Sequence, residues 1–563
     1  MKDRFYLKSC LFLAVLLAGA APLAGQQVPD ADDMEASVDS IFSAFDGPNQ
    51  PGAAVAVWQD GKIAFSKGYG SANVEYGIPV TPDETIFHVA SVSKQFTVYA
   101  ILLLQADGKL SLDDPIRKHI PEVPDFGTPI TLRHLASHTS GMRDQWSLLQ
   151  MAGWRMDDVI TVDHILKLVE RQKDLNFQPG EEFNYCNTGF TLLAETVART
   201  SGLTFAEFTQ ERIFEPLGLE HTLFYDDHEK IVPNRAYSYY RENDVLKKAV
   251  LSFANAGATS LFTTAEDLVR WADHLNNPPS QKVEAMVAQM DRLAVLNNGE
   301  TFGGAYGQFI SPYKGLKQIQ HGGADAGYRS YLGRFPEQDF AVAVVSNYAD
   351  SGPNRLALQV ADLFLKDHIE EQEEGPVPPE PPTIAMDEDV LKAFEGYYWF
   401  DEQQTYRRIY LKDGYLMYHR AGGAENRIAP IGPNQFKMLD VGVNALVEFT
   451  EENQGRVMTF KDPGGEITRM ASFDYVEGDP DLFERYAGTY YSPELDTSYQ
   501  LVVENGKLMA RHNRLPDVPL SLIRGDRFSI GPYSALFKRN PDGEISAMLV
   551  TTGRIRDLVF EKQ

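Results

Sequence analysis

Cysteine is almost absent from this sequence of 563 residues, which contains only Cys10 and Cys186. Cys10 lies in an N-terminal segment that we expect to be removed from the mature protein. A single remaining cysteine can form neither an intrachain disulfide nor a multi-cysteine metal site. We expect Cys186 to pack inward as a small apolar residue.

Long apolar runs are also missing after the N-terminal segment. Residues 1–25 have the pattern of a secretory signal peptide, in which Lys2, Arg4 and Lys8 precede a short apolar run and small residues follow it. That run is too short to cross a bilayer as a stable helix. We therefore expect a cleaved signal peptide, a periplasmic or secreted protein, and no stable membrane insertion.

Positive charge is scarce, since the sequence has 52 lysines and arginines but 79 aspartates and glutamates, giving a formal net charge of −27. Such a surface disfavours nucleic acid and anionic membranes as partners. The sequence also lacks a Gly-x-Ser-x-Gly elbow, a His-Glu-x-x-His zinc helix and a phosphate-cradling loop. Nothing in it requires a metal or a cofactor, and the expected partner is a small-molecule or short-peptide substrate. The oligomeric state stays open.

Prolines and glutamates are concentrated in residues 370–383. This composition predicts a stiff, extended, solvated linker. The preceding residues, 28–369, have strand-like patterns near both ends and helical patterns between them. This order predicts one domain built on an antiparallel sheet, with its first and last helices packed on one face.

Individual elements of this first domain follow from hydrophobic periodicity and turn residues. Thr263-x-x-Glu266 predicts a capping box at the start of one helix. The expected strands are 53–58, 62–66, 317–321, 328–335 and 340–346, and the expected helices are 34–46, 162–172, 188–200, 204–214, 264–276 and 354–366.

The sequence after the linker contains an internal repeat of 92 residues. Two copies are too few for a solenoid, and closing each copy into a barrel would remove its exposed strand edges. We therefore predict two small antiparallel β-barrels, at residues 384–475 and 476–563. The hairpin turns Asp413-Gly414 and Asn505-Gly506 lie at equivalent points. The matching positions are Gly396 and Gly488, Gly414 and Gly506, and Phe436 and Phe528.

One stretch of the first domain predicts a reactive side chain. Ser91 and Lys94 lie at the start of an apolar helix, so the hydroxyl and the amine share one face, one turn apart. The partial positive charge and unpaired N–H groups of a helix N-terminus favour a developing alkoxide. The pair is therefore suited to an activated nucleophile. A second Ser-x-x-Lys, at 311–314, is followed by glycine and by no apolar helix, so it predicts a turn.

Two further motifs offer partners for this nucleophile. Tyr185-Cys186-Asn187 lies between a Pro-Gly turn and a predicted helix, and it is the only Tyr-x-Asn in the sequence. His321-Gly322-Gly323 ends a predicted strand and is the only His-x-Gly. Glycine at such a place lets the backbone approach a ligand closely.

The three motifs in this order resemble those of the penicillin-recognising serine hydrolases, in the class C β-lactamase-like, D-aminopeptidase and esterase branch. Residues 135–141 and 257–261 resemble supporting stretches of the same family. The resemblance covers about residues 35–367, and the repeated half is similar to the paired lipocalin-like barrels of D-aminopeptidase members. The implied fold is an α+β (α/β) β-lactamase-like catalytic domain, with an antiparallel sheet flanked by helices, followed by two small antiparallel β-barrels.

The resemblance also implies roles for individual residues. Ser91 would attack a carbonyl and form an acyl-enzyme, and Lys94 and Tyr185 would share the proton transfers, with the resting base left open. Asn187 would hold Lys94 and contact the substrate. The N–H groups of Ser91 and Ala324 would form the oxyanion hole, with His321 and Gly323 at the pocket. His138 is expected to be structural.

The third motif departs from the Lys-Thr-Gly or Lys-Ser-Gly of many β-lactamases and cell-wall peptidases. A histidine near its ordinary pKa of about 6.5 is mostly neutral at pH 7, unlike lysine. The departure favours esters, amides and short D-residue peptides over substrates with a free carboxylate. β-Lactamase or D,D-carboxypeptidase activity is the alternative, and a non-catalytic ligand-binding or sensory protein is an alternative of another class. The barrels either shape the substrate pocket or only stabilise the protein.

Overall fold

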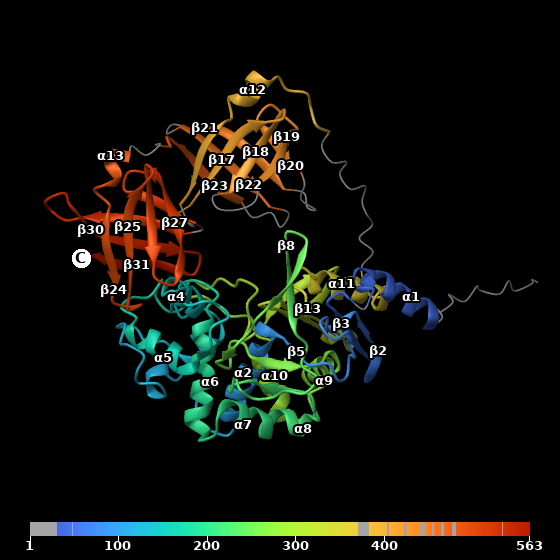
Figure 1. Cartoon of the computed structure of the whole chain (residues 1–563). Helices are drawn as coiled ribbons and strands as arrows, with labels where there is room; N and C mark the ends of the chain where they lie inside the picture. The colour runs from blue at the N-terminus through green and yellow to red at the C-terminus, as the bar shows by residue number, and fades with distance from the viewer. Residues whose placement is uncertain are drawn as a thin grey trace, which may run out of the picture.

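The computed structural model describes residues 31–47, 49–369, 382–401, 405–420, 425–439, 445–452, 455–462, 467–475, 480–531 and 533–563. The predicted signal peptide and residues 370–381 of the predicted linker lie outside the described residues. Within these ranges, no helix has the length and apolar character needed to cross a membrane. An α/β domain is followed by two closed barrels (Figure 1), which confirms the predicted architecture.

A six-stranded antiparallel sheet forms the centre of the α/β domain. Its order is β12-β13-β14-β15-β1-β2, so β1 and β15 are neighbours inside the sheet although they lie at opposite ends of the domain sequence. Every residue of β15 is buried, because helices cover both faces. The strands are β1 (Ala53–Gln59), β2 (Lys62–Tyr69), β12 (Phe309–Tyr313), β13 (Leu316–Asp325), β14 (Tyr328–Phe335) and β15 (Phe340–Ser346).

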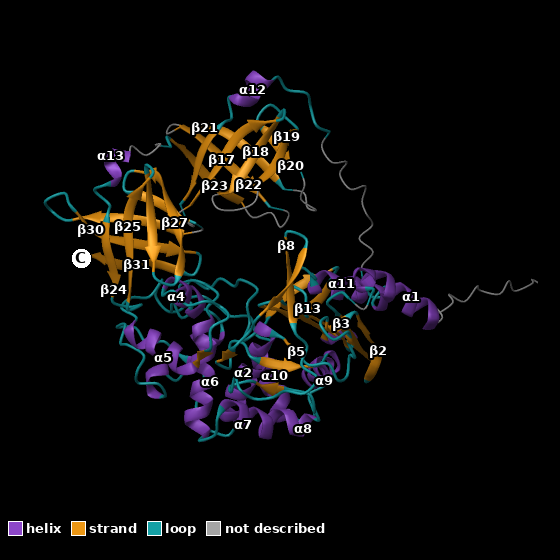
Figure 2. Ribbon diagram, in the orientation of Figure 1, coloured by secondary structure: helices purple, strands orange, loops and turns teal. Residues whose placement is uncertain are grey.

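The first and last helices of the domain, α1 (Ala31–Phe42) and α11 (Pro353–Phe364), cover one face of this sheet (Figure 2). Phe42 of α1 and Val360 of α11 share a buried cluster with Val342 of β15. The predicted placement of these two helices is confirmed.

The other face of the sheet is covered by α9 (Ala265–Asn276), which packs on α2 (Ser93–Ala106). Trp271 of α9 stacks on Phe96 of α2, with ring centroids 4.2 Å apart. The predicted cap of α9 was one residue early, since the hydroxyl of Thr264 accepts the bond from the Asp267 N–H.

A helical region extends from α2 to the side of the sheet and carries the loops around the site (Figure 1). The predicted helix 204–214 divides into α7 and a π-helical turn at Gln210–Phe214. Besides α2, the helices of this helical region are α3 (Leu132–Ala136), α4 (Gln145–Met151), α5 (Val162–Arg171), α6 (Asn187–Ser201), α7 (Phe205–Thr209), α8 (Glu215–Leu217) and α10 (Gln281–Met290).

Each half of the repeat forms a closed antiparallel barrel of eight strands. Barrel 1 consists of β16 (Gly396–Phe400), β17 (Thr405–Lys412), β18 (Tyr415–Arg420), β19 (Glu425–Pro430), β20 (Gln435–Met438), β21 (Leu446–Glu452), β22 (Gly455–Lys461) and β23 (Ile467–Phe473). Barrel 2 consists of β24 (Gly488–Ser492), β25 (Thr497–Glu504), β26 (Lys507–His512), β27 (Leu515–Arg524), β28 (Arg527–Ile530), β29 (Tyr533–Arg539), β30 (Ile545–Thr552) and β31 (Ile555–Lys562). Their likeness to lipocalins and the exact domain limits stay predictions.

The two barrels use the same local contacts at equivalent positions. In barrel 1 the hydroxyl of Tyr398 donates to the carbonyl of Phe394 at 2.9 Å, and in barrel 2 Tyr490 donates to Tyr486 at 2.8 Å. Both hairpin turns have two consecutive residues with positive φ, as a type I′ turn requires. Barrel 2 lies against α4 (Figure 1), where the hydroxyl of Tyr499 donates to the carbonyl of Met151 at 2.9 Å.

Candidate active site

The loop that carries Ser91 is held on both sides. β5 (Phe87–His88) pairs with β11 (Leu261–Thr263), and a 3-10 turn at Ala90–Val92 then leads into α2. The hydroxyl of Ser330 donates to the carbonyl of Val89 at 2.7 Å. A Cβ atom at Gly323 would lie 2.2 Å from the same carbonyl oxygen. Position 323 therefore requires glycine because β13 packs directly on the loop that carries Ser91. The close approach of a ligand is not the only reason for glycine there.

Lys94 is completely buried and makes three hydrogen bonds. Its ammonium nitrogen, Nζ, lies 3.0 Å from Ser91 Oγ, 2.9 Å from Asn187 Oδ1 and 2.7 Å from the carbonyl oxygen of Ala258. Burial lowers the pKa of Lys94 to about 7, while the negative charges of Asp325 and Asp144 act in the opposite direction. A substantial fraction of Lys94 is therefore neutral near pH 7 and can accept a proton from Ser91.

Tyr185 lies beside the same pair, with Lys94 Nζ 4.9 Å from its ring centroid. Burial raises the pKa of Tyr185 above its ordinary value, and its hydrogen bond with Ser91 acts in the opposite direction. The phenol is therefore protonated at rest. His138 stacks on the tyrosine ring at 4.1 Å, and its Nδ1 accepts the Cys186 N–H at 3.0 Å. These contacts agree with the structural role predicted for His138, which stays a prediction.

Asn187 is oriented by a carboxylate that sequence reasoning missed. Oδ2 of Asp144 accepts both the backbone N–H and the side-chain amide of Asn187, each at 2.8 Å. These two bonds direct Oδ1 of Asn187 towards Lys94. Asp144 also caps α4 by accepting the N–H groups of Trp146 and Ser147. The only sequence signal for it was an aspartate in front of a helix.

His321 is buried and electrically neutral. Its Nδ1–H donates to the carbonyl of Gly322 at 2.6 Å, so Nε2 is the unprotonated nitrogen. No described side chain or backbone group pairs with this Nε2. Burial lowers the pKa of His321 to about 3, with a smaller effect of Lys94 in the same direction. The third motif thus presents an acceptor and not a cation.

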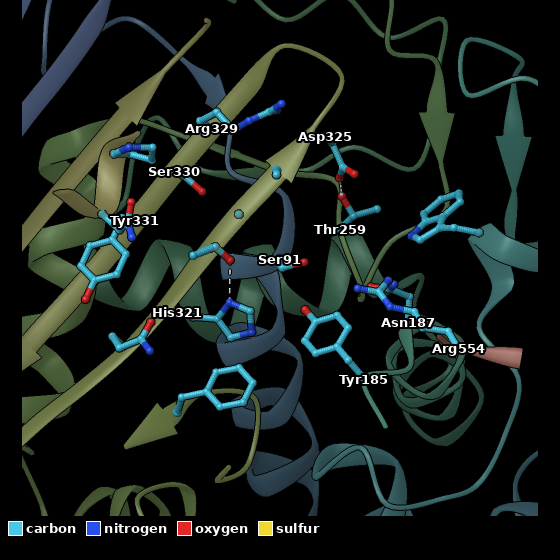
Figure 3. A pocket seen from close by; sticks show the side chains of 18 residues that line it. Ser91, Tyr185, Asn187, Thr259, His321, Asp325, Arg329, Ser330, Tyr331 and Arg554 are labelled. Atoms are coloured by element: carbon cyan, nitrogen blue, oxygen red, sulfur yellow. Dashed lines mark hydrogen bonds between the residues drawn. The ribbon is translucent and has the colours of Figure 1, made fainter. Parts of the chain in front are cut away.

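These side chains converge on one cavity of about 550 Å³ (Figure 3). Lys94 is fully buried and does not line the cavity itself, but it contacts Ser91, which does. The other predicted site residues line the cavity: Ser91, Tyr185, Asn187, His321, Gly323 and Ala324. The second Ser-x-x-Lys does not contribute, because Ser311 lies in β12 and Lys314 pairs with Asp362 at 2.6 Å. Lys314 occupies the β12–β13 turn, as predicted, but Ser311 belongs to a strand that was not predicted.

Other charged residues line the same cavity and were not predicted. Asp325 follows the third motif on β13 and accepts a hydrogen bond from the hydroxyl of Thr259. Burial raises the pKa of Asp325 to about 6, against the effects of Thr259 and Lys94. Arg329 of β14 also lines the wall. Among the described residues, no three His, Cys, Asp or Glu side chains are grouped to hold a metal ion.

Arg554 enters the cavity from barrel 2, in the turn between β30 and β31 (Figure 3). Its guanidinium carbon lies 5.0 Å from the ring centroid of Tyr185, and one nitrogen lies 3.9 Å from Asp144. Asn176 donates to the carbonyl of Arg554 at 3.0 Å, and Asn184 donates to that of Gly553 at 2.9 Å. The cavity therefore carries permanent positive charge, although position 321 does not.

Comparisons with known proteins agree with this geometry. The family model Beta-lactamase matches residues 38–365. A D-aminopeptidase of Gluconobacter oxydans (strain 621H) is 25% identical over 94% of this chain and 98% of its own length, and one of Brucella anthropi is 23% identical over 92% and 96%. The octameric penicillin-binding protein homologue from Pyrococcus abyssi superposes with a TM-score of 0.55 at 25% identity, over 78% of this chain and 99% of its own. The chain belongs to the Beta-lactamase family and is a serine hydrolase.

Proposed function

We propose that this protein hydrolyses small amides, short peptides and esters through an acyl-enzyme on Ser91. The observation that carries the proposal is the approach of buried Lys94 Nζ to Ser91 Oγ, at 3.0 Å, where Ser91 lines a cavity. Hydroxyl and amine at this distance are within reach of a direct proton transfer.

In the first half of the reaction, neutral Lys94 takes the proton of Ser91 as Oγ bonds to the substrate carbonyl carbon. The carbonyl electron pair moves onto its oxygen, where the N–H groups of Ser91 and Ala324 stabilise the negative charge. As the tetrahedral intermediate collapses, the bond to the leaving group breaks, and Tyr185 or Lys94 supplies the proton that the departing amine or alcohol needs. The product of this half is an ester of Ser91.

In the second half, water attacks this ester and the same groups act in reverse. The base removes a proton from water, a second tetrahedral intermediate forms, and Ser91 leaves with its proton restored. Asn187, fixed by Asp144, keeps Lys94 in place throughout and can donate its amide to the substrate. Each catalytic cycle consumes one water molecule.

Small amides and short peptides with a D-residue are the proposed substrate class. The support is that two D-aminopeptidases match this chain almost from end to end, barrels included. The carboxylate of Asp325 at the cavity wall offers a partner for the ammonium group of such substrates. The neutral acceptor at His321 is compatible with amide and hydroxyl donors of the substrate.

A second candidate substrate class carries a free carboxylate, as in β-lactams and cell-wall peptides. The observation that favours it is the pair Arg329 and Arg554 at the cavity wall. Guanidinium groups bind carboxylates with two parallel hydrogen bonds. A non-catalytic binding protein is disfavoured, because a scaffold without catalytic demand has no need to keep a buried lysine bonded to both serine and asparagine.

We further propose that the protein works in the periplasm or outside the cell. The basic, apolar and small-residue pattern of residues 1–25 supports this location. Fractionation of a bacterial host and N-terminal sequencing of the mature protein test it. A protein that stays in the cytoplasm with residues 1–25 intact would overturn it.

A substrate screen with wild type and Ser91→Ala side by side tests the function. The panel comprises p-nitrophenyl esters, D- and L-amino-acid p-nitroanilides and a chromogenic cephalosporin. We expect turnover of D-alanine p-nitroanilide and of short-chain esters, lost in the variant. Preference for the cephalosporin would favour the second candidate, and equal turnover by Ser91→Ala would contradict the proposal.

A further inference from the structure

The mouth of barrel 2 contains a second cavity, with a volume of about 370 Å³. It is separate from the active site, since none of the described residues that line one cavity lines the other. Both barrel 2 and the α/β domain contribute to its wall. Its aromatic and thioether side chains are Met151, Trp154, Tyr499, Tyr533, Met548 and Phe560.

The internal repeat shows why barrel 2 is hollow at this point. Ala510 lines the cavity, whereas the equivalent residue of barrel 1, 92 positions earlier, is Tyr418. The registers agree, because Ala510 pairs with Leu501 and Tyr418 pairs with Ile409 in the two barrels. Tyr418 is buried in the interior of barrel 1, so its side chain fills the space that Ala510 leaves open.

The α/β domain closes the open end of barrel 2. α4 lies against this end and α13 (Pro480–Phe483) lies at the other (Figure 1). Arg514 lies over the ring of Trp154 at 5.6 Å and pairs with Asp158 at 2.6 Å. A Cβ atom at Gly153 would lie 2.0 Å from the ring of His512. The loop after α4 is therefore tightly seated on the barrel rim, and the cavity lies between them.

The chemistry of the wall defines what this cavity can hold. None of the described residues that line it carries a charge. The hydroxyl of Tyr499 already donates to the carbonyl of Met151. Half-buried Tyr533, the indole N–H of Trp154 and the amide of Gln150 are the other polar side-chain groups of the wall. A cavity of this size with aromatic walls and few polar groups suits a small, apolar ligand, while a charged ligand would lose hydration without a partner.

We propose that barrel 2 binds an uncharged lipophilic molecule in this cavity, between Ala510 of the barrel interior and Trp154 of the α/β domain. The site is independent of hydrolysis at Ser91. It exists because the second copy of the repeat has alanine where the first has tyrosine. The half-buried residues Leu515 and Ile530 and the exposed Pro516 line its rim, where a ligand can enter.

Titration of the full-length protein with the neutral fluorophore N-phenyl-1-naphthylamine tests this site. We expect a saturable rise in fluorescence with one equivalent bound. Ala510→Tyr, which copies barrel 1, should weaken binding at least tenfold and leave Ser91-dependent hydrolysis unchanged. Lys507→Tyr is the matched control, because it adds a tyrosine to the exposed side of the same strand and should bind like wild type.

A second variant decides the question if Ala510→Tyr does not fold. Ile530→Glu places a carboxylate in the half-buried rim, where it can reach water, and should also weaken binding at least tenfold. Probe bound after Ser91 has been blocked by a fluorophosphonate must bind outside the active site. The proposal would be overturned if wild type showed no saturable binding. It would also be overturned if the folded cavity variants bound the probe with the same affinity as wild type and Lys507→Tyr.

Discussion

Arg143 of the α/β domain and Glu494 of barrel 2 form a buried ion pair, with Nη1 and Oε2 2.5 Å apart. Arg143 also donates to the backbone carbonyl of Arg556 at 3.0 Å. Arg143 is the neighbour of Asp144, which orients Asn187. One of the contacts that hold barrel 2 in place is thus made by the residue next to Asp144, which supports the active site.

Replacement of Glu494 by alanine should destabilise the protein strongly. Loss of one partner leaves the guanidinium of Arg143 buried without its counter-charge, which costs about 3–5 kcal/mol of the free energy of unfolding. Chemical denaturation followed by tyrosine and tryptophan fluorescence measures this loss. The control is Glu504→Ala, which removes an exposed partner of Arg511 and should cost at most about 1 kcal/mol. Equal effects of the two substitutions would contradict the structural role of the pair.

The rate constant kcat/KM should rise with pH and level off above about pH 7. Lys94 has a pKa lowered to about 7 by burial, so its neutral, proton-accepting form is present above that pH and is lost below it. Lys94→Arg should reduce kcat/KM by about 10²-fold or more, because arginine stays protonated. Initial rates between pH 5 and 9 measure the profile.

The titration of Asp325 must be distinguished from that of Lys94 in this pH profile, since the pKa of Asp325, about 6, is close to that of Lys94. Asp325→Asn removes a carboxylate that raises the pKa of Lys94. The inflection should therefore persist and move to lower pH. Disappearance of the inflection in this variant would assign it to Asp325 and contradict Lys94 as the base.

Asp144→Asn should reduce activity without changing the substrate preference. The variant loses the carboxylate oxygen that accepts two hydrogen bonds from Asn187, so the amide that holds Lys94 is free to rotate. We expect a fall in kcat of about tenfold or more, and a loss of stability of about 2 kcal/mol for the bonds to a charged group. Steady-state kinetics and thermal unfolding measure both. Unchanged kcat in a destabilised variant would limit Asp144 to a role in folding.

Arg554→Ala tests how barrel 2 affects the substrate. If the guanidinium contacts substrate, kcat/KM should fall about tenfold for peptides with a free carboxylate and little for their methyl amides. The pH inflection should also move up, because the charge of Arg554 lowers the pKa of Lys94. Arg511→Ala, on the exposed side of the barrel, is the control. If kcat/KM fell equally for both kinds of peptide and the pH inflection did not move, the β30–β31 hairpin that carries Arg554 would have a stabilising role only.

The parts of the site that lie in contiguous motifs could be predicted from the sequence. Ser91 and Lys94 share one helical turn, and Tyr185 with Asn187 and His321 with Gly323 are short, unique patterns. The strands of the sheet other than β12 were predictable from local pattern as well, most clearly Phe340–Ser346, which is a continuous apolar run. The repeat predicted the two barrels because both copies have a hairpin turn at the equivalent point, Asp413-Gly414 and Asn505-Gly506.

The parts of the site that come from outside these motifs could not be predicted from the sequence. Arg554 follows Ser91 by several hundred residues, and only the docking of barrel 2 brings it to the cavity. Asp144 was not singled out, since its Oδ2 meets Asn187 only after α4 and α6 have packed. The apolar cavity at Ala510 required the closed barrel and its contact with Trp154. Each depends on tertiary packing and not on local pattern.

Covalent labelling of Ser91 tests the central claim most directly. Wild type should gain the mass of one fluorophosphonate probe, located by peptide mass spectrometry at Ser91. Ser311→Ala, which alters the other Ser-x-x-Lys, should be labelled like wild type, and Ser91→Ala should not be labelled at all. Labelling that persists at full extent in Ser91→Ala, or that requires Ser311, would contradict the account.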